Sequence, residues 1–322
     1  MKMNEMFKVD KKKPVHRRDV LVALVIGFAL LIMGAFVDLN FSKSVYDPVN
    51  TSWFGIIFAG IAELPVCIGL ISGGVLLFLS RLRKGKENKE KIDILFYIIA
   101  VLAVLAGYYF LFDTLKDIDM FKNLEDKKTL IMILALAFAL VFGTAVLFGT
   151  FLLSKHSTVE AMFKVGFFLI IICAGTAVVG NIFKYLWCRP RPRFIVTNDW
   201  EGFHSLWQLS PFACFNKSLT GGESNNLKSF PSGHSMYAGT GLFVFPLLTM
   251  LFPKTENNRK LQVGLFYGAL LWTIICMVSR VYAGAHFLSD TAAGLLTSIL
   301  VGTVVYAIMF EKQISEDDPA NA

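Results

Sequence analysis

The chain has 322 residues, of which 55% are hydrophobic and 14% aromatic, and its formal net charge is +7 at pH 7. A mean hydropathy of +0.59 excludes an ordinary soluble domain of this length. The cations gather in short segments between apolar stretches, which is typical of a membrane protein with basic loops and argues against a nucleic-acid-binding protein. We therefore expect an integral membrane protein that is surrounded by the lipid bilayer and has no nucleic-acid partner.

Eight apolar stretches have the length needed to cross a bilayer, about 18 to 25 residues. They are Val20–Val37, Trp53–Ser80, Ile94–Phe112, Leu130–Leu153, Val165–Phe183, Ser235–Phe252, Leu265–Val278 with its continuation, and Ser289–Phe310. No small-residue cleavage site follows the first stretch, so we interpret it as a membrane helix and not as a secretory signal. The fold class that we expect is all-α, a polytopic membrane helix bundle with about eight spans.

The chain divides into four parts on this map. We expect a basic cytoplasmic head at 1–19, two additional N-terminal membrane spans within 20–90, a six-helix core at 91–310, and an acidic cytoplasmic tail at 311–322. The core contains one long outer loop, 193–230, between its third and fourth spans.

The distribution of cations predicts the orientation. Lys and Arg are concentrated in the head, in the connection after the second span and in the connection after the sixth. Short cytoplasmic loops retain such residues, so we expect these segments and both termini in the cytoplasm. The connections after the fifth and seventh spans then face the outside of the cell membrane.

Three polar clusters lie at the ends of the last four spans. They are Lys184 with Arg191-Pro192, then Pro231-Ser232-Gly233-His234, then Ser279-Arg280 followed by His286 and Asp290. Lys and Arg donate hydrogen bonds to phosphoryl oxygens, and two histidines can divide the tasks of nucleophile and proton donor. Ser232 is expected to cap a helix that begins near His234. His286 and Asp290 are four residues apart, so on a helix they share a face and the carboxylate can orient the imidazole.

The order and spacing of these clusters resemble the three-part signature of the type-2 phosphatidic acid phosphatase superfamily, over about residues 165–310. That superfamily shares its fold with soluble acid phosphatases and vanadium haloperoxidases, and the hydropathy of this chain favours its membrane branch of lipid phosphatases. The resemblance implies a phosphohistidine formed on His286, with His234 as proton donor and Asp290 as the partner of His286. It implies phosphate binding by Lys184, Arg191, Arg280, Ser232 and Gly233. No metal ion and no other cofactor is expected.

The expected function is metal-independent hydrolysis of a lipid phosphomonoester or lipid pyrophosphate at the outer membrane face. Phosphatidic acid, phosphatidylglycerol phosphate and polyprenyl pyrophosphate all fit, because the signature reads only the phosphoryl group. A lipid phosphotransferase that uses the same site is an alternative. A lipid-phosphate transporter or scramblase is an alternative of a different class, and it would still move lipid after His286→Ala. The oligomeric state is left open.

Three further residues are candidate accessory residues. Glu63 is an acid inside a long apolar stretch, and such residues are costly enough to indicate function by default, although a packing or capping role fits equally. Arg189 and Arg193 flank Arg191. The prolines between these arginines are expected to hold them in an extended strip after the fifth span, which can also serve as an interfacial anchor.

The loop 193–230 contains aromatic residues, among them Trp200 and Trp207. One hypothesis is an interfacial lid that guides a lipid tail, and the alternative is an aromatic belt without selectivity. Cys188 and Cys214 both lie on the outer side and can pair, but two cysteines do not establish a disulfide.

Overall fold

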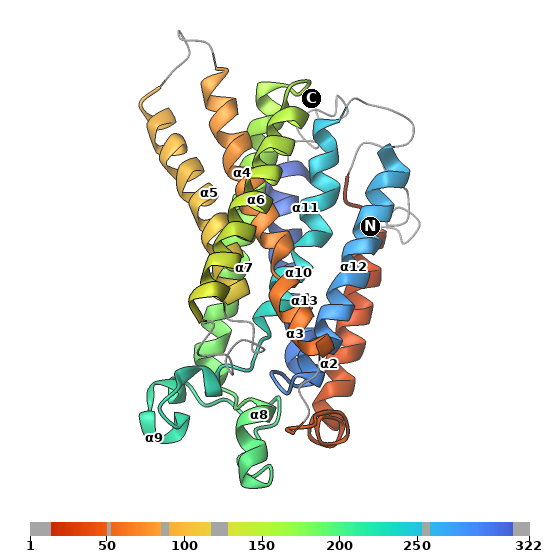
Figure 1. Ribbon diagram of the computed structural model, residues 1–322. Coiled ribbons are helices and arrows are strands. Elements are labelled where there is room, and N and C mark those ends of the chain that lie inside the picture. Colours follow the sequence, from red (N-terminus) through yellow and green to blue (C-terminus); the bar gives the residue numbers. More distant parts are fainter. Residues whose placement is uncertain (1–13, 50–52, 85–89, 117–127, 253–257, 312–322) are drawn as a thin grey trace.

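The computed structural model describes residues 14–49, 53–84, 90–116, 128–252 and 258–311. Every regular element in these ranges is helical, and the long helices run side by side in one bundle (Figure 1). The long helices are α2 (Arg17–Val45), α4 (Leu64–Leu82), α5 (Ile92–Lys116), α6 (Lys128–Ser154), α7 (Val159–Trp187), α12 (Asn258–Tyr282) and α13 (Leu288–Tyr306). The acidic tail and the first 13 residues of the basic head lie outside the described residues. The expected all-α bundle is confirmed.

Shorter helices complete the architecture. They are α3 (Trp53–Ile61), α8 (Pro192–Ile195), α9 (Lys217–Thr220), α10 (Gly233–Gly239), α11 (Gly241–Leu248) and the short turns η4 (Val196–Asn198), η5 (Ala213–Phe215), η6 (Ser224–Leu227), η7 (Thr249–Leu251) and η8 (Ala307–Glu311). The loop 193–230 is thus a series of short helices and turns, and α8 and α9 lie beyond the lower end of the bundle in Figure 1.

The number of spans differs from the expected eight. Among the described residues, seven helical segments are long and apolar enough to cross a membrane, and Ser235–Phe252 is not one of them. That stretch is divided into α10 and α11, of 7 and 8 residues, which meet at Thr240. Gly239 and Gly241 flank this residue, and Pro246 inside α11 has no N–H to donate, so the sequence does not favour one continuous helix here.

Close contacts between helices depend on small residues. This is expected in a bilayer, because lipid tails are as apolar as the side chains and helices associate mainly through close packing. A Cβ atom placed on Gly166 of α7 would lie 2.8 Å from the carbonyl oxygen of Gly73 in α4. On the other side, a Cβ on Gly34 of α2 would lie 2.5 Å from the backbone nitrogen of Ser289 in α13. The N-terminal helices therefore pack directly on the helices that carry the motifs.

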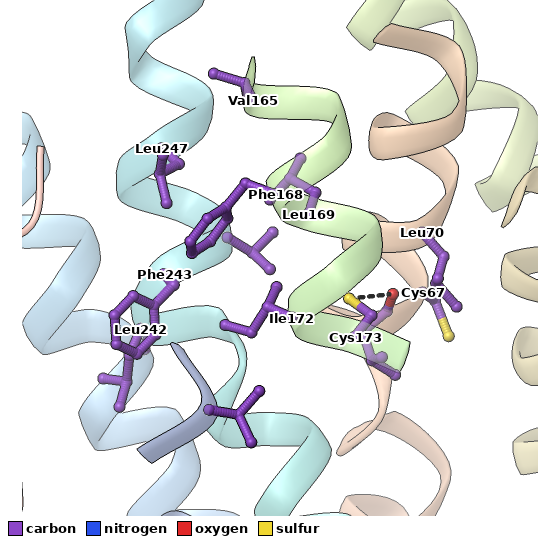
Figure 2. Packing of buried hydrophobic residues seen from close by; sticks show 14 of the residues in the cluster. Cys67, Leu70, Val165, Phe168, Leu169, Ile172, Cys173, Leu242, Phe243 and Leu247 are labelled. Atoms are coloured by element: carbon purple, nitrogen blue, oxygen red, sulfur yellow. Dashed lines mark hydrogen bonds between the residues drawn. The ribbon is translucent and has the colours of Figure 1, made fainter. Parts of the chain in front are cut away.

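The centre of the bundle is a large hydrophobic cluster. Figure 2 shows Phe168 and Ile172 of α7 facing Leu242 and Phe243 of α11, and the thiol of Cys173 pointing toward α4. That thiol donates to the carbonyl oxygen of Val66 at 3.6 Å. This packing fixes α7 against α4 and α11.

One end of the bundle gathers the motifs. The last turns of α7 and α12 and the first turns of α10 and α13 meet there, beside the short helices of loop 193–230 (Figure 1). The four helix ends on which the three clusters lie are therefore brought together as expected.

Candidate active site

His286 lies in the turn between α12 and α13 and is only 1% exposed. Its Nδ1 atom is 2.6 Å from the carbonyl oxygen of Ser229. Because a carbonyl oxygen only accepts, Nδ1 must carry the proton, and the lone pair is on Nε2. Nε2 in turn lies 3.4 Å from Nη1 of Arg191. The unprotonated nitrogen therefore faces a cation.

The protonation state of His286 follows from its surroundings. Burial lowers the pKa of this imidazole well below its usual value, and the charges of Arg191, His234 and Lys184 lower it further, while the bond to Ser229 opposes them. His286 is consequently neutral at neutral pH, which is the form required of a nucleophile.

Asp290 does not contact His286 in the way that their spacing suggested. The structure places Ser229 between them: its carbonyl holds His286, and its hydroxyl donates to Oδ2 of Asp290 at 2.6 Å. The same carboxylate oxygen accepts from the backbone N–H of Phe287 at 2.8 Å. At the first turn of α13, the carboxylate accepts from a backbone N–H, and its link to the imidazole runs through Ser229.

The cations of the motifs converge on this region. Arg191 donates from Nε to the carbonyl oxygen of Asn225 at 2.8 Å and from Nη1 to that of Ala285 at 3.1 Å. Arg280 donates to the carbonyl oxygen of Gly55 in α3. These backbone acceptors fix the direction of each guanidinium group.

Lys184 comes from the last turn of α7 and faces the start of α10. Its Nζ would lie 3.2 Å from a Cβ atom built on Gly233. A side chain at position 233 would therefore crowd the ammonium group, which gives a physical reason for glycine at this position.

The start of α10 has the expected cap. Ser232 accepts from the backbone N–H of Ser235 at 3.4 Å, and its own N–H donates to the carbonyl oxygen of Asp290 at 2.9 Å. His234, the next residue but one, is half-buried and interacts electrostatically with Arg280 and Arg191. The second cluster is thereby tied both to α13 and to the cations.

Glu63 lies at the break between α3 and α4. It occupies the N-cap position of α4, but its side chain makes no capping hydrogen bond, so the capping interpretation is wrong. The carboxylate accepts from Thr114 at 2.8 Å and interacts electrostatically with Lys184 and Arg280. The acid therefore lies beside the cationic region, and its role stays a prediction.

The arginines that flank Arg191 have different surroundings, so the expected extended strip is only partly correct. Arg189 is fully buried and turns toward α2 and α13. Arg191 is extended, whereas Arg193 lies within the short helix α8 and donates its N–H to the carbonyl oxygen of Gly284 at 2.8 Å.

Ser229, Asp38 and Ser289 are the residues that sequence reasoning missed. Ser229 precedes the second cluster by two positions and resembles an ordinary loop serine. Asp38 had a signal that could have found it: Gly34, Asp38 and Ser42 follow one another at intervals of four residues, all buried on one face of α2.

The two tryptophans of the outer loop differ in their surroundings. Trp200 lies near Lys43, with the ammonium 6.0 Å from the ring centre, while Trp207 is 73% exposed. Cys188 and Cys214 belong to one buried cluster as free thiols, so the structure does not contain the disulfide that their position allows. Burial and the neighbouring Cys188 raise the pKa of Cys214 to about 11.

Comparison with known proteins gives a family match. Residues 163–314 match the family model of the PAP2 superfamily, which confirms the resemblance expected from the three clusters. The matched range contains all three clusters and the loop 193–230, whereas α2 to α6 precede it.

Three curated relatives are similar to parts of the chain. Phosphatidylglycerophosphatase B of Haemophilus influenzae is 31% identical over 27% of this chain and 34% of its own. Lipid A 4'-phosphatase of Porphyromonas gingivalis is 27% identical over 51% of this chain and 58% of its own. Lipid phosphate phosphatase 1 of Arabidopsis thaliana is 30% identical over 44% of this chain and 43% of its own. The chain thus spans between about a third and three fifths of the length of these relatives. No solved structure matches it.

Proposed function

We propose that the protein is a membrane phosphatase that hydrolyses a lipid phosphomonoester or a lipid pyrophosphate, since residues 163–314 match the family model of the PAP2 superfamily. The observation that carries the proposal is the pairing at His286: a buried imidazole with its proton on Nδ1 and its Nε2 lone pair 3.4 Å from Arg191. A neutral nucleophile beside a cation is suited to attack on a phosphoryl group, whose oxygens the cation binds.

The proposed reaction has two steps. Nε2 of His286 attacks phosphorus, the P–N bond forms, and the P–O bond to the lipid breaks while His234, which takes up a proton when the anionic substrate binds beside it, gives that proton to the leaving oxygen. In the second step, His234 takes a proton from water, the resulting hydroxide attacks phosphorus, and the P–N bond breaks to release phosphate. Asp290, acting through Ser229, keeps the Nδ1 proton of His286 in place in both steps.

Charge on the transferred phosphoryl group is held by side chains in this proposal. Lys184, Arg191 and Arg280 neutralise the equatorial oxygens, and Ser232 and Gly233 border the same space. We propose that no metal ion takes part. In the described ranges, no three His, Cys, Asp or Glu side chains form a group that could hold one.

The orientation of the protein is part of the proposal. Basic residues at the end opposite the motifs, such as Arg81 and Lys84, favour the cytoplasm for that end. We propose the cell membrane as location, with α10 and α11 together crossing it as an eighth, broken span, cytoplasmic termini and an active site that faces the outside. Cysteine-accessibility labelling in intact cells, at one loop of each end, tests this arrangement.

The proposed substrates share a phosphate and an apolar tail. The names of the three relatives each describe a phosphatase that acts on a lipid, and seven helices among the described residues are long and apolar enough to cross a bilayer, which supports a lipid substrate. Phosphatidic acid, phosphatidylglycerol phosphate and undecaprenyl pyrophosphate are the first candidates. A phosphotransferase would give the same intermediate with another acceptor, and product analysis separates it from a hydrolase.

The test is phosphate release in EDTA by detergent-purified protein from these three lipids in parallel. His286→Ala is the inactive variant, and His156→Ala is the matched control, because His156 is exposed in the connection between α6 and α7 at the far end of the bundle. We expect release by the wild type and by His156→Ala, and none by His286→Ala.

Two results would contradict the proposal. Equal release by the wild type and His286→Ala would show that this imidazole is no nucleophile. Movement of lipid between leaflets that persists in His286→Ala, without phosphate release by any of the proteins, would favour a transporter or scramblase.

A further inference from the structure

Arg189, to which the proposed reaction gives no role, is at the centre of a buried ionic cluster. The residue is 0% exposed, and its Nη1 donates to Oδ1 of Asp290 at 2.6 Å and to the hydroxyl of Ser289 at 2.7 Å. Its Nη2 donates to Oδ2 of Asp38 at 2.9 Å, and its Nε to the carbonyl oxygen of His204 at 2.8 Å. One guanidinium therefore binds two carboxylates that come from different helices.

Asp38 reaches this cluster from α2, which lies outside the range of the family match. Its Oδ1 accepts from the backbone N–H of Ser289 at 3.0 Å, and its Oδ2 accepts from the hydroxyl of the same residue. Gly34, one turn earlier, allows this approach because a Cβ there would lie 2.5 Å from the nitrogen of Ser289. Asp38 thus binds both Arg189 and the first turn of α13.

The cluster is connected to the reacting imidazole by two hydrogen bonds. Asp290 accepts from Arg189 on Oδ1 and from the Ser229 hydroxyl on Oδ2, each at 2.6 Å. The carbonyl of Ser229 accepts from Nδ1 of His286, also at 2.6 Å. These bonds give a shift of Arg189 a direct route to the ring whose Nε2 faces Arg191.

We propose that Asp38 is a positioning residue that acts on His286 through Arg189. A buried guanidinium needs opposite charge nearby. When Asp38 is neutral, Arg189 is attracted to Asp290 alone and draws that carboxylate away from Ser229. The first turn of α13 also loses an acceptor for the N–H of Ser289. Because a displacement of about 1 Å in an active site can cost about 100-fold in rate, the effect falls on the chemical step.

The same helix provides a matched control. Asp19 is also a buried carboxylate of α2, and it pairs with Arg259 at 3.3 Å and accepts from Tyr267 at 3.1 Å. These partners lie at the end of the bundle away from His286. Asp19→Asn therefore removes a buried negative charge from α2 without touching the cluster at Arg189.

The experiment compares Asp38→Asn with Asp19→Asn in the full-length protein, and it rests on the proposed phosphatase activity. We expect Asp38→Asn to lower kcat about 10- to 100-fold, with KM changed less than about twofold, and Asp19→Asn to leave both within about twofold. Ser289→Ala keeps all three charges of the cluster and removes only a hydroxyl, so it stays measurable if Asp38→Asn does not fold. We expect it to lower kcat about threefold.

A second readout does not need turnover. The rate at which diethyl pyrocarbonate modifies His286, followed on the peptide that contains it, should rise at least about fivefold in Asp38→Asn and stay unchanged in Asp19→Asn. If the wild type hydrolyses no lipid phosphate, the proposed function fails while this readout still decides the role of Asp38. Wild-type kcat in Asp38→Asn, or equal losses in both Asp variants in proportion to the folded fraction, would overturn the inference.

Discussion

Two pairs of cations, one pair at each end of the bundle, are held in different ways. At the end away from the motifs, Arg81 and Lys84 both pair with Asp93, at 3.3 and 3.2 Å. At the motif end, Arg191 and Arg280 donate to backbone carbonyl oxygens. A carboxylate neutralises the charge of a cation, whereas a backbone carbonyl fixes the direction of a guanidinium group.

Arg189 shows that the motif end also uses the first kind of contact. Its two carboxylate partners make it part of the framework, although only one residue separates it from Arg191. Residue type and position in the sequence therefore do not distinguish Arg189 from Arg191; the acceptors around each guanidinium do.

The largest expected effect is the loss of kcat/KM when an arginine at the motif end is replaced, compared with an arginine at the other end. Arg191→Ala should lower kcat/KM about 1,000-fold, because it removes a preorganised donor for the charge of the transition state. Arg259→Ala, which breaks the ion pair with Asp19, should change kcat/KM less than about twofold. The measurement is initial-rate kinetics with phosphatidic acid in detergent, and similar losses in the two variants would contradict the difference between the ends.

A smaller loss is expected at Gly233. In Gly233→Ala the new Cβ lies 3.2 Å from the position of the Lys184 ammonium, which must move. We expect inhibition by vanadate, which mimics the phosphoryl group in transfer, to weaken about tenfold. Gly268→Ala is the matched control, since a Cβ there meets nothing within 4 Å. Unchanged vanadate inhibition in Gly233→Ala would remove Lys184 from the phosphate site.

The pH profile tests the neutral state of His286. With an ordinary pKa of about 6.5, activity at pH 5.5 would fall about tenfold. Because burial and Arg191 lower this pKa, kcat/KM at pH 5.5 should stay within about threefold of its value at pH 7.5. Two substrates whose own phosphate pKa values differ separate the ionisation of the substrate from that of the enzyme.

The same shift has a consequence for stability. The unfolded imidazole takes up a proton near pH 6.5, whereas the folded one does not until lower pH. The unfolded state therefore binds more protons, and the contribution of His286 to the free energy of unfolding is present above pH 6.5 and lost as the pH falls below it. His286→Ala should have a weaker dependence of Tm on pH in this window.

The smallest effect concerns the outer loop. Trp207→Ala should lower the ratio of activity on phosphatidic acid to activity on a water-soluble phosphate ester about twofold, if the loop guides a lipid tail. Trp53→Ala is the control, because Trp53 is 66% exposed at the start of α3, outside the loop. Equal changes in both variants would favour an aromatic belt without selectivity.

Local patterns predicted most of the fold and of the site. Apolar stretches predicted the long helices, and the cluster spacing predicted that Lys184, His234, Arg280 and His286 meet at one end. The division at Thr240 was missed because hydropathy is continuous across it, although Gly239 and Gly241 flank it.

Contacts between residues that are far apart in the chain could not be predicted from local sequence patterns. Ser229 is 57 residues from His286, and Asp38 is 151 residues from Arg189. No local periodicity connects such pairs. The orientation of His286 was therefore assigned to Asp290, which is near in the sequence, whereas the backbone of Ser229 makes the direct contact.

The contact between Asp38 and the start of α13 has a consequence for biosynthesis. Asp38 enters the membrane before Arg189 has been translated, and α13 follows every other element of the site in the chain. The Asp38 carboxylate therefore has neither Arg189 nor Ser289 as a partner until α7 and then α13 have been inserted. A chain that stopped at the end of α12 would contain Lys184, Arg191 and Arg280 but neither His286 nor the first turn of α13, which binds Asp38. Under the proposed reaction such a truncated chain has no nucleophile, so catalytic competence arises with the last helix.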